Sequence, residues 1–199
     1  MPKILELKPN QRLFVISGPS GVGKDTVIEG LREFLDFNWV ISTTDRAKRE
    51  GEKEGKPYHF ISPGKFDEMI KNNEFVEHDH MYGFRCGTAF AAIENAFRDS
   101  QVVIWKGYPQ SLKRIKEIVP EATFIAILPP VFSALEKRLR KRGADSEESI
   151  QERIAVAKGD LEALEFVDYK VINPEGKPEL ASKEIFKIIK KETKNCGIM

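Results

Sequence analysis

Seven residues near the amino terminus have the types and spacing of a loop that binds phosphate groups. They lie between an apolar run and an amphipathic segment, in the order Gly18-Pro19-Ser20-Gly21-Val22-Gly23-Lys24. A strand–loop–helix context of this kind is what a phosphate-binding loop requires. The glycines let backbone N–H groups turn inward around phosphate oxygens, and Lys24 adds a cation near the terminal phosphates. Because both the spacing and the context are present, we expect this loop to bind the phosphates of a nucleotide.

The position after Lys24 departs from the usual pattern of such loops. Most of them have Ser or Thr there, whose hydroxyl holds Mg²⁺, whereas this chain has Asp25 followed by Thr26. A carboxylate is a hard oxygen ligand, so Asp25 could bind Mg²⁺ directly or through water. Without a metal ion, the same carboxylate would repel nucleotide phosphates. Both effects predict an activity that depends closely on Mg²⁺.

Apolar runs that alternate with amphipathic segments indicate how this loop is positioned. Buried strands are expected at residues 12–17, 39–42, 101–105, 123–128 and 169–172. Helices are expected at about 25–35 and at 89–99, 110–118, 133–142, 146–165 and 180–194, with Asp145 and Glu148 capping the fifth of them. The continuous apolar character of the strands fits a parallel sheet covered on both faces. The pattern predicts an α/β fold with right-handed crossovers.

Two segments depart from this alternation. Residues 43–88 are polar and rich in glycine, with short strand candidates only at 58–61 and 75–79, so we expect an inserted lobe there. Residues 137–153 are dense in Arg, Lys and Glu, which favours a mobile helical segment. The 199 residues suit one compact domain with mobile parts and are too few for two domains of ordinary size.

Composition excludes several classes of protein. Because 32 Lys and Arg balance 31 Asp and Glu, the formal net charge of +1 argues against a general nucleic-acid binder. The two cysteines, Cys86 and Cys196, support neither a disulfide framework nor a zinc site. The amino terminus lacks a signal-peptide pattern and no apolar run reaches the ~20 residues of a membrane span, so we expect a cytoplasmic protein. The tail at 196–199 fits a prenylation box loosely, but a frayed helix end is the simpler interpretation.

Further motifs, together with the phosphate loop, resemble the guanylate kinase family from Gln11 to about Lys191. They are Ser42-Thr43-Thr44, Arg46, Arg49, Gly51-Glu52, Gly55, Tyr58-His59-Phe60, Asn73-Glu74-Phe75-Val76-Glu77, Gly87-Thr88, Pro129-Pro130, Arg138-Leu139, Arg142-Gly143 and Ser146-Glu147-Glu148-Ser149-Ile150. The resemblance implies the three-layer α/β/α fold of P-loop NTPases, with a central parallel five-stranded sheet. It also implies a core (1–42, 89–134 and 167–199), an inserted lobe that binds the nucleoside monophosphate, NMP (43–88), and a helical lid (135–166).

The resemblance implies phosphoryl transfer from ATP to GMP, and to dGMP, with Mg²⁺ as cofactor. The protein would be a monomer or homodimer, with no nucleic acid or membrane as partner. The residues that would bind ATP are Gly18, Ser20, Gly21, Val22, Gly23, Lys24, Asp25, Thr26 and Asn173, with Asp25 on the metal. Those that would bind GMP are Ser42, Arg46, Arg49, Tyr58, Glu77, Gly87 and Thr88. The catalytic residues would be Lys24, Arg138, Arg142 and Arg153.

The side-chain chemistry at these positions suits the implied reaction. Arg46 and Arg49 are three residues apart, so both could grip one phosphate. Glu77 could accept hydrogen bonds from the N1–H and amino group of guanine, while Thr88 meets O6. Arginines of the lid, such as Arg153, could stabilise charge on the phosphoryl group in transfer. The alternative for Arg46 and Arg49 is a pair of solvated surface arginines. For the lid arginines it is a charged helix surface with Glu partners.

Several positions depart from the family pattern. Cys86 stands where the family usually has Tyr, and we expect it to be a small buried side chain. Lys106 and Tyr108 replace an acidic pair, and Pro174 replaces an acid. We hypothesise that Asp25 returns a carboxylate to the metal region.

These departures leave two alternatives open. One is a related kinase with another acceptor, such as ribose 1,5-bisphosphate or a different NMP. The other is a non-catalytic module that binds protein partners, although such modules typically lose the phosphate loop. The presence of Lys24, Tyr58 and Glu77 favours a nucleotide kinase.

Overall fold

The computed structural model describes residues 4–56, 58–81, 83–142 and 146–194. The tail with Cys196 therefore lies outside the described residues. The strands of the central sheet are β1 (Arg12–Ser17), β2 (Asn38–Trp39), β7 (Val102–Lys106), β8 (Thr123–Leu128) and β9 (Tyr169–Ile172). They run parallel in the order β2-β7-β1-β8-β9. The five-stranded parallel sheet expected from the sequence is thus confirmed.

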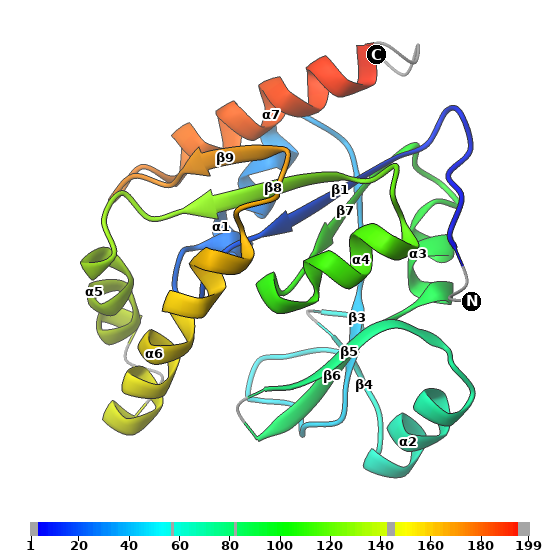
Figure 1. Cartoon of the computed structure of the whole chain (residues 1–199), viewed down its shortest axis with the longest axis horizontal. Coiled ribbons are helices and arrows are strands. Elements are labelled where there is room, and N and C mark those ends of the chain that lie inside the picture. Colours follow the sequence, from blue (N-terminus) through cyan, green and yellow to red (C-terminus); the bar gives the residue numbers. More distant parts are fainter. Residues whose placement is uncertain (1–3, 57, 82, 143–145, 195–199) are drawn as a thin grey trace.

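Helices cover both faces of this sheet and make three layers (Figure 1). Successive residues of β1 point to opposite faces: Leu13 and Val15 join one apolar cluster, and Phe14 and Ile16 join the other. The first cluster includes residues of α3 (Phe90–Ala96) and α4 (Leu112–Ile118). The second includes residues of α1 (Lys24–Gly30) and α7 (Pro178–Lys194). The sheet is buried on both sides, which explains why its strands are apolar throughout.

The first helix is shorter than expected. It ends at Gly30 and passes into the 3₁₀ turn η1 (Leu31–Glu33) instead of continuing to residue 35. A side chain at Gly30 would meet the hydroxyl of Ser182 on α7 at 2.6 Å. That hydroxyl donates to the carbonyl oxygen of Val27 at 2.8 Å. Close approach to α7 therefore accounts for the glycine at this point of α1.

Segment 43–88 contains most of a second sheet. It contains β3 (Ser42–Thr44), β4 (Tyr58–Phe60), β5 (Phe75–Met81) and β6 (Phe84–Ala89), in the order β4-β3-β6-β5. The prediction of one strand over 39–42 was wrong, because this segment is divided between the two sheets. Helix α2 (Pro63–Lys71), which the sequence analysis did not predict, begins after Ser62, whose hydroxyl accepts the N–H of Lys65 at 3.2 Å.

Two helices follow β8 at the end of the sheet toward which β8 and β9 point (Figure 1). They are α5 (Ser133–Arg142) and α6 (Glu147–Ala163). Ser146 caps α6 by accepting the N–H of Ser149 at 3.3 Å. This cap replaces the one expected at Asp145, which lies outside the described residues. Between β7 and α4 the chain makes a short 3₁₀ turn, η2 (Pro109–Ser111).

No helix in the described parts of the chain is both long and apolar enough to span a membrane.

Candidate active site

The phosphate loop joins β1 to α1, and its shape depends on glycine. Gly23 has φ 94°, and a side chain there would come within 2.8 Å of the amide nitrogen of Asn173. A side chain on Gly18 would collide with the carbonyl oxygen of Ile127. These two positions admit only glycine, which allows the loop to fold tightly against β8 and β9. The motif in the sequence therefore reflects a steric requirement.

Lys24 extends back over this loop. Its ammonium group donates to the carbonyl oxygens of Gly18 and, at 3.1 Å, of Pro19. Burial lowers the pKa of Lys24 to about 8, and the nearby cation of Lys106 adds to this effect. An anion bound beside Lys24 would stabilise its charged form. The group is therefore suited to bind phosphate.

A cavity of about 690 Å³ opens over the loop and receives side chains from both sheets and from α5 and α6. Its volume lies in the range of small-molecule binding sites. The expected site residues that line it are Gly18, Ser20, Gly21, Gly23, Lys24, Asp25, Thr26, Arg46, Arg49, Tyr58, Arg138 and Arg153. Two sets of cations therefore face the same cavity. One set comes from the phosphate loop, α5 and α6, and the other comes from the second sheet and its loops.

Arginines of α5 and α6 contact the phosphate loop directly. Arg153 donates from Nε to the hydroxyl of Ser20 at 3.0 Å. Arg138 donates to the carbonyl oxygens of Val22 at 2.9 Å and Asn173 at 2.8 Å. Arg153 therefore lies where phosphate would bind, whereas Arg138 also ties α5 to the loop. The side chain of Arg142 lies outside the described parts of the structure.

Asn173, expected near the adenine of ATP, lies behind the loop. It is buried, and its amide group donates to the carbonyl oxygen of Val22 at 2.7 Å. Neither Asn173 nor Val22 lines the cavity. In this position Asn173 supports the backbone of the loop.

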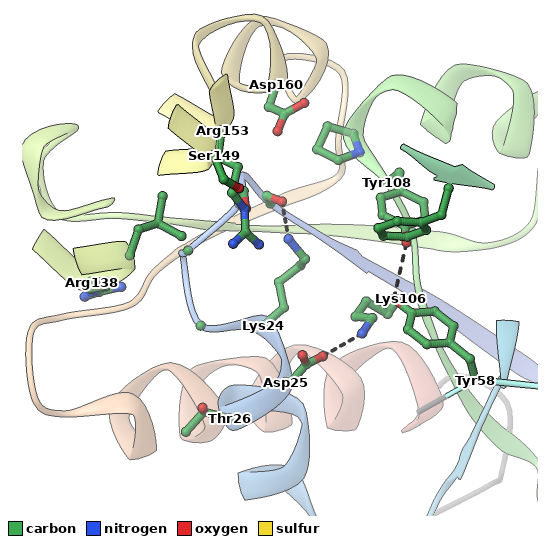
Figure 2. Close-up of a pocket in the computed structure, with 18 of the residues that line it drawn as sticks. Lys24, Asp25, Thr26, Tyr58, Lys106, Tyr108, Arg138, Ser149, Arg153 and Asp160 are labelled. Atoms are coloured by element: carbon green, nitrogen blue, oxygen red, sulfur yellow. Dashed lines mark hydrogen bonds and ion pairs between the residues drawn. The ribbon is translucent and has the colours of Figure 1, made fainter. Parts of the chain in front are cut away.

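Asp160 of α6 is a cavity residue that the sequence analysis missed (Figure 2). Burial raises the pKa of its carboxyl group, while a hydrogen bond from Gln110 and the charge of Lys24 oppose that shift. Asp160 shares the inner face of α6 with the buried residues Ile150 and Ala157. An acidic residue at a position of the helix that otherwise holds apolar residues could have identified Asp160 from the sequence.

The second sheet contributes an arginine that is already oriented. Arg46 makes a bidentate ion pair with Glu52, at 2.7 and 2.6 Å. Its guanidinium carbon lies 5.5 Å from the ring centre of Tyr58 and 5.6 Å from that of Phe84, within the range of cation–π contacts. Hydrogen bonds from Arg46 lower the pKa of Glu52 to about 2, so Glu52 is ionised. Glu52 belongs to the Gly51-Glu52 motif, but its pairing with Arg46 was not expected from the sequence.

Arg49 also reaches the cavity, but its side chain is exposed. Its backbone N–H donates to Glu52 at 2.8 Å. The same carboxylate thus holds the loop that carries both arginines.

A buried polar group lies deeper, between β5, β6 and β7. The hydroxyls of Ser42 and Thr88 are 2.9 Å apart, and the indole N–H of Trp105 donates to Thr88 at 3.1 Å. Glu77 is 2% exposed, and burial raises its pKa to about 7 against the opposing effect of the Thr88 and Ser111 hydroxyls. Among the described residues, Oε2 of Glu77 has no hydrogen-bond partner. A buried oxygen without a partner can accept a donor from outside the chain, such as a group of a ligand or a water molecule.

Gly87 lies beside this group and has a steric role. A side chain there would come within 2.8 Å of the Phe75 ring and 2.9 Å of the carbonyl oxygen of Glu77. The glycine therefore allows β5 and β6 to approach closely at Glu77.

Three of the positions that depart from the family pattern, Cys86, Lys106 and Tyr108, lie close together. The Cys86 side chain is buried, as expected, and burial raises the pKa of its thiol. The hydroxyls of Tyr58 and Tyr108 are 3.4 Å apart. The ammonium of Lys106 donates to Asp25 at 2.8 Å, so the carboxylate expected to hold a metal is paired with a cation (Figure 2). Within the described residues, no three or more His, Cys, Asp or Glu side chains are grouped as a metal site.

Comparison with known proteins gives a consistent result. The family model for guanylate kinase matches residues 10–192. A guanylate kinase from Trichormus variabilis is 37% identical over 175 residues, which cover 87% of this chain and 88% of that protein. One from Carboxydothermus hydrogenoformans is 40% identical over 162 residues, covering 81% and 79% of the two chains.

The fold comparison agrees. The crystal structure of guanylate kinase from Anaplasma phagocytophilum superposes with a TM-score of 0.71 at 24% identity, covering 92% of this chain and 86% of that one. The sequence similarity extends over nearly the whole chain, and the chain belongs to the guanylate kinase family.

Proposed function

We propose that the cavity binds ATP and GMP together, with their phosphates facing one another. The chain is an ATP-dependent kinase that phosphorylates GMP to GDP. The observation that carries the arrangement is the convergence of Lys24 and Arg153 with Arg46 and Arg49 on one cavity. Two phosphate-bearing substrates require two sets of cations around a common centre.

Glu77 supports guanine as the acceptor base. Guanine presents two adjacent donors, N1–H and the amino group, that would satisfy the partnerless oxygen of Glu77. Adenine has an acceptor at N1, so its binding would leave a buried carboxylate oxygen unpaired at considerable cost. Thr88 lies beside Glu77 and would meet the guanine O6 atom.

The catalytic assignment follows from the requirements of phosphoryl transfer. The step needs positioned reactants and neutralised charge, and no side-chain nucleophile. Lys24 and Arg153 lie at the loop and would stabilise the group in transfer, with Arg138 beside them. We propose the same role for Arg142 from the resemblance alone. We assign residues 43–88 as the NMP-binding lobe and 135–166 as the lid, and propose that both close over the bound substrates and exclude water.

The residues present also fit a magnesium ion bound with ATP. Asp25 offers a carboxylate at the cavity, and its side chain is 72% exposed, so water and phosphate oxygens can complete the coordination. Thr26 adds a hydroxyl beside it. When bound, Mg²⁺ neutralises charge on the phosphates. The role of the protein is to present Asp25 beside Lys24.

The acceptor preference gives a direct test. We expect GMP and dGMP to be phosphorylated with kcat/KM at least about 100-fold above AMP, UMP and ribose 1,5-bisphosphate, since only guanine satisfies Glu77. A coupled assay of ADP release across these acceptors measures this, with chelation of Mg²⁺ expected to abolish turnover. A preference for ribose 1,5-bisphosphate would assign the chain to a different acceptor.

Replacing Glu52 tests how the acceptor phosphate is held. Glu52→Gln removes the charged partner that orients Arg46, so we expect KM for GMP to rise about tenfold while kcat changes little. Glu54→Gln is the matched control, because Glu54 lies on the same loop and pairs with Lys48 and His59. Steady-state kinetics of both variants, with circular dichroism as a check on folding, measure the effect. An unchanged KM in Glu52→Gln would remove Glu52 from the binding site.

A further inference from the structure

Lys106 and Asp25 form an ion pair inside the cavity that the reaction scheme above does not use. Lys106 ends β7, and Asp25 lies in the first turn of α1, so two elements that are distant in sequence meet there. The two side chains differ greatly in environment, since that of Lys106 is 17% exposed and that of Asp25 is 72% exposed. A mostly buried cation therefore depends on a carboxylate that faces solvent.

Lys106 lies between the two substrate-binding regions. Its ammonium is 5.6 Å from the ring centre of Tyr58, on the acceptor side, and its charge lowers the pKa of Lys24, on the ATP side. Figure 2 shows Lys106 between Asp25 and the Tyr58–Tyr108 pair. It thus faces the space where the phosphates of the two substrates would meet.

The electrostatics of this arrangement favour an added anion. Lys24 and Lys106 repel one another across the cavity, and an anion between them would relieve that repulsion. Asp25 is 72% exposed and can be solvated when it leaves, whereas the buried Lys106 ammonium needs an anion, which a phosphate oxygen would supply. Asp25 is in turn the carboxylate placed to take up Mg²⁺ with ATP.

Resting on the function proposed above, we propose that Lys106 is a second phosphate-binding lysine, held by Asp25 in the empty protein. In the complex with ATP and magnesium, Asp25 would hold the ion and Lys106 would turn to the phosphate oxygens between donor and acceptor. Lys106 at the end of β7 would then replace an acid of the family pattern by a cation, and Asp25 on α1 would supply the acid instead. Lys106 would stabilise the group in transfer together with Lys24.

A bisubstrate probe tests this proposal with a readout that is independent of activity. The probe is adenosine linked 5′–5′ to guanosine through five phosphates, which spans both binding regions. We expect Lys106→Met to raise the Kd of this probe at least tenfold, with Kd for ATP alone or GMP alone changing less than threefold. Lys116→Met is the matched control, because Lys116 pairs with Asp168 on the surface. Lys106→Gln serves with the same thresholds if the Met variant does not fold.

The partner residue gives the second half of the experiment. We expect Asp25→Asn to tighten binding of ATP measured without Mg²⁺ and to remove most of the gain in affinity that Mg²⁺ provides. The proposal would be overturned if Lys106→Met changed the Kd of the probe by less than tenfold. It would also be overturned if Mg²⁺ still increased the affinity of Asp25→Asn for ATP as it does in the unsubstituted protein. Failure of the unsubstituted protein to phosphorylate GMP would overturn the proposed function instead, so the two failures are distinguishable.

Discussion

Replacing Lys24 with alanine is expected to lower kcat by about 10³-fold or more without loss of the fold. The ammonium of Lys24 is the cation of the phosphate loop, and removal of one preorganised charge from such a site typically costs two to three orders of magnitude in rate. Burial already disfavours the charged form of Lys24, whose pKa is about 8. The melting temperature should therefore be unchanged or higher in the variant.

The measurement for Lys24→Ala is turnover of saturating ATP and GMP, paired with thermal unfolding. Lys183→Ala is the matched control, because Lys183 is exposed on α7 and does not line the cavity. Near-normal turnover in Lys24→Ala would contradict the assignment of the cavity as a phosphoryl-transfer site. A loss of activity accompanied by unfolding would show that Lys24 is structural.

Replacing Glu77 with glutamine is expected to remove activity toward GMP and to stabilise the protein. A carboxylate accepts two hydrogen bonds from guanine, whereas the glutamine amide offers one acceptor and adds an N–H donor. We expect kcat/KM for GMP to fall at least about 10³-fold, because the mismatched amide would leave buried polar groups unpaired. The stabilisation arises because glutamine is neutral, while burial of the Glu77 carboxylate is unfavourable.

The pH dependence of that stabilisation has a definite sign. The pKa of Glu77 is about 7 in the folded protein, against 4.5 for an ordinary glutamate. Between these two values the folded state holds a proton that the unfolded chain has released, so the free energy of unfolding falls as pH rises through that window. Glutamine has no such loss, so the variant should be more stable by about 2–3 kcal/mol above pH 7 and no more stable near pH 4.5.

Chemical denaturation of Glu77→Gln at several pH values checks this result. Glu117→Gln on the exposed face of α4 is the control, and its stability should follow that of the unsubstituted protein. If the variant and the unsubstituted protein had the same free energy of unfolding at every pH, Glu77 would not be buried as a carboxylate. In the unsubstituted protein, affinity for GMP should rise with pH through about 7, as Glu77 loses its proton.

The parts of the fold that were predictable are those determined by local sequence. Strand β1 and its loop were expected because an apolar run and a glycine motif lie side by side in the chain. Helix α2 was missed because it is polar and only Phe66 and Met69 of it are buried. The strand expected over 39–42 was divided because Ser42–Thr44 pairs with β4 and β6, which are distant in sequence.

In the site, too, residues within local motifs were predictable and contacts between distant segments were not. Lys24, Arg46 and Glu77 were expected from motifs, since each belongs to a short segment with a recognisable pattern. The pairing of Asp25 with Lys106 depends on contact between β7 and β1, which no local pattern reveals. The partnerless oxygen of Glu77 likewise depends on which groups the fold brings near it.

The contacts of the Val22 carbonyl bear on how the lid can move. That oxygen accepts hydrogen bonds from Arg138 and Asn173, and Leu139 of α5 packs so closely on Gly21 that a side chain there would lie 2.9 Å from it. Arg138 and Leu139 therefore tie the middle of α5 to the phosphate loop before any nucleotide binds. We expect the part of the lid that follows Leu139 to move farther on closure than residues 135–139, and Arg153, which already contacts Ser20 of the loop, to move with α6.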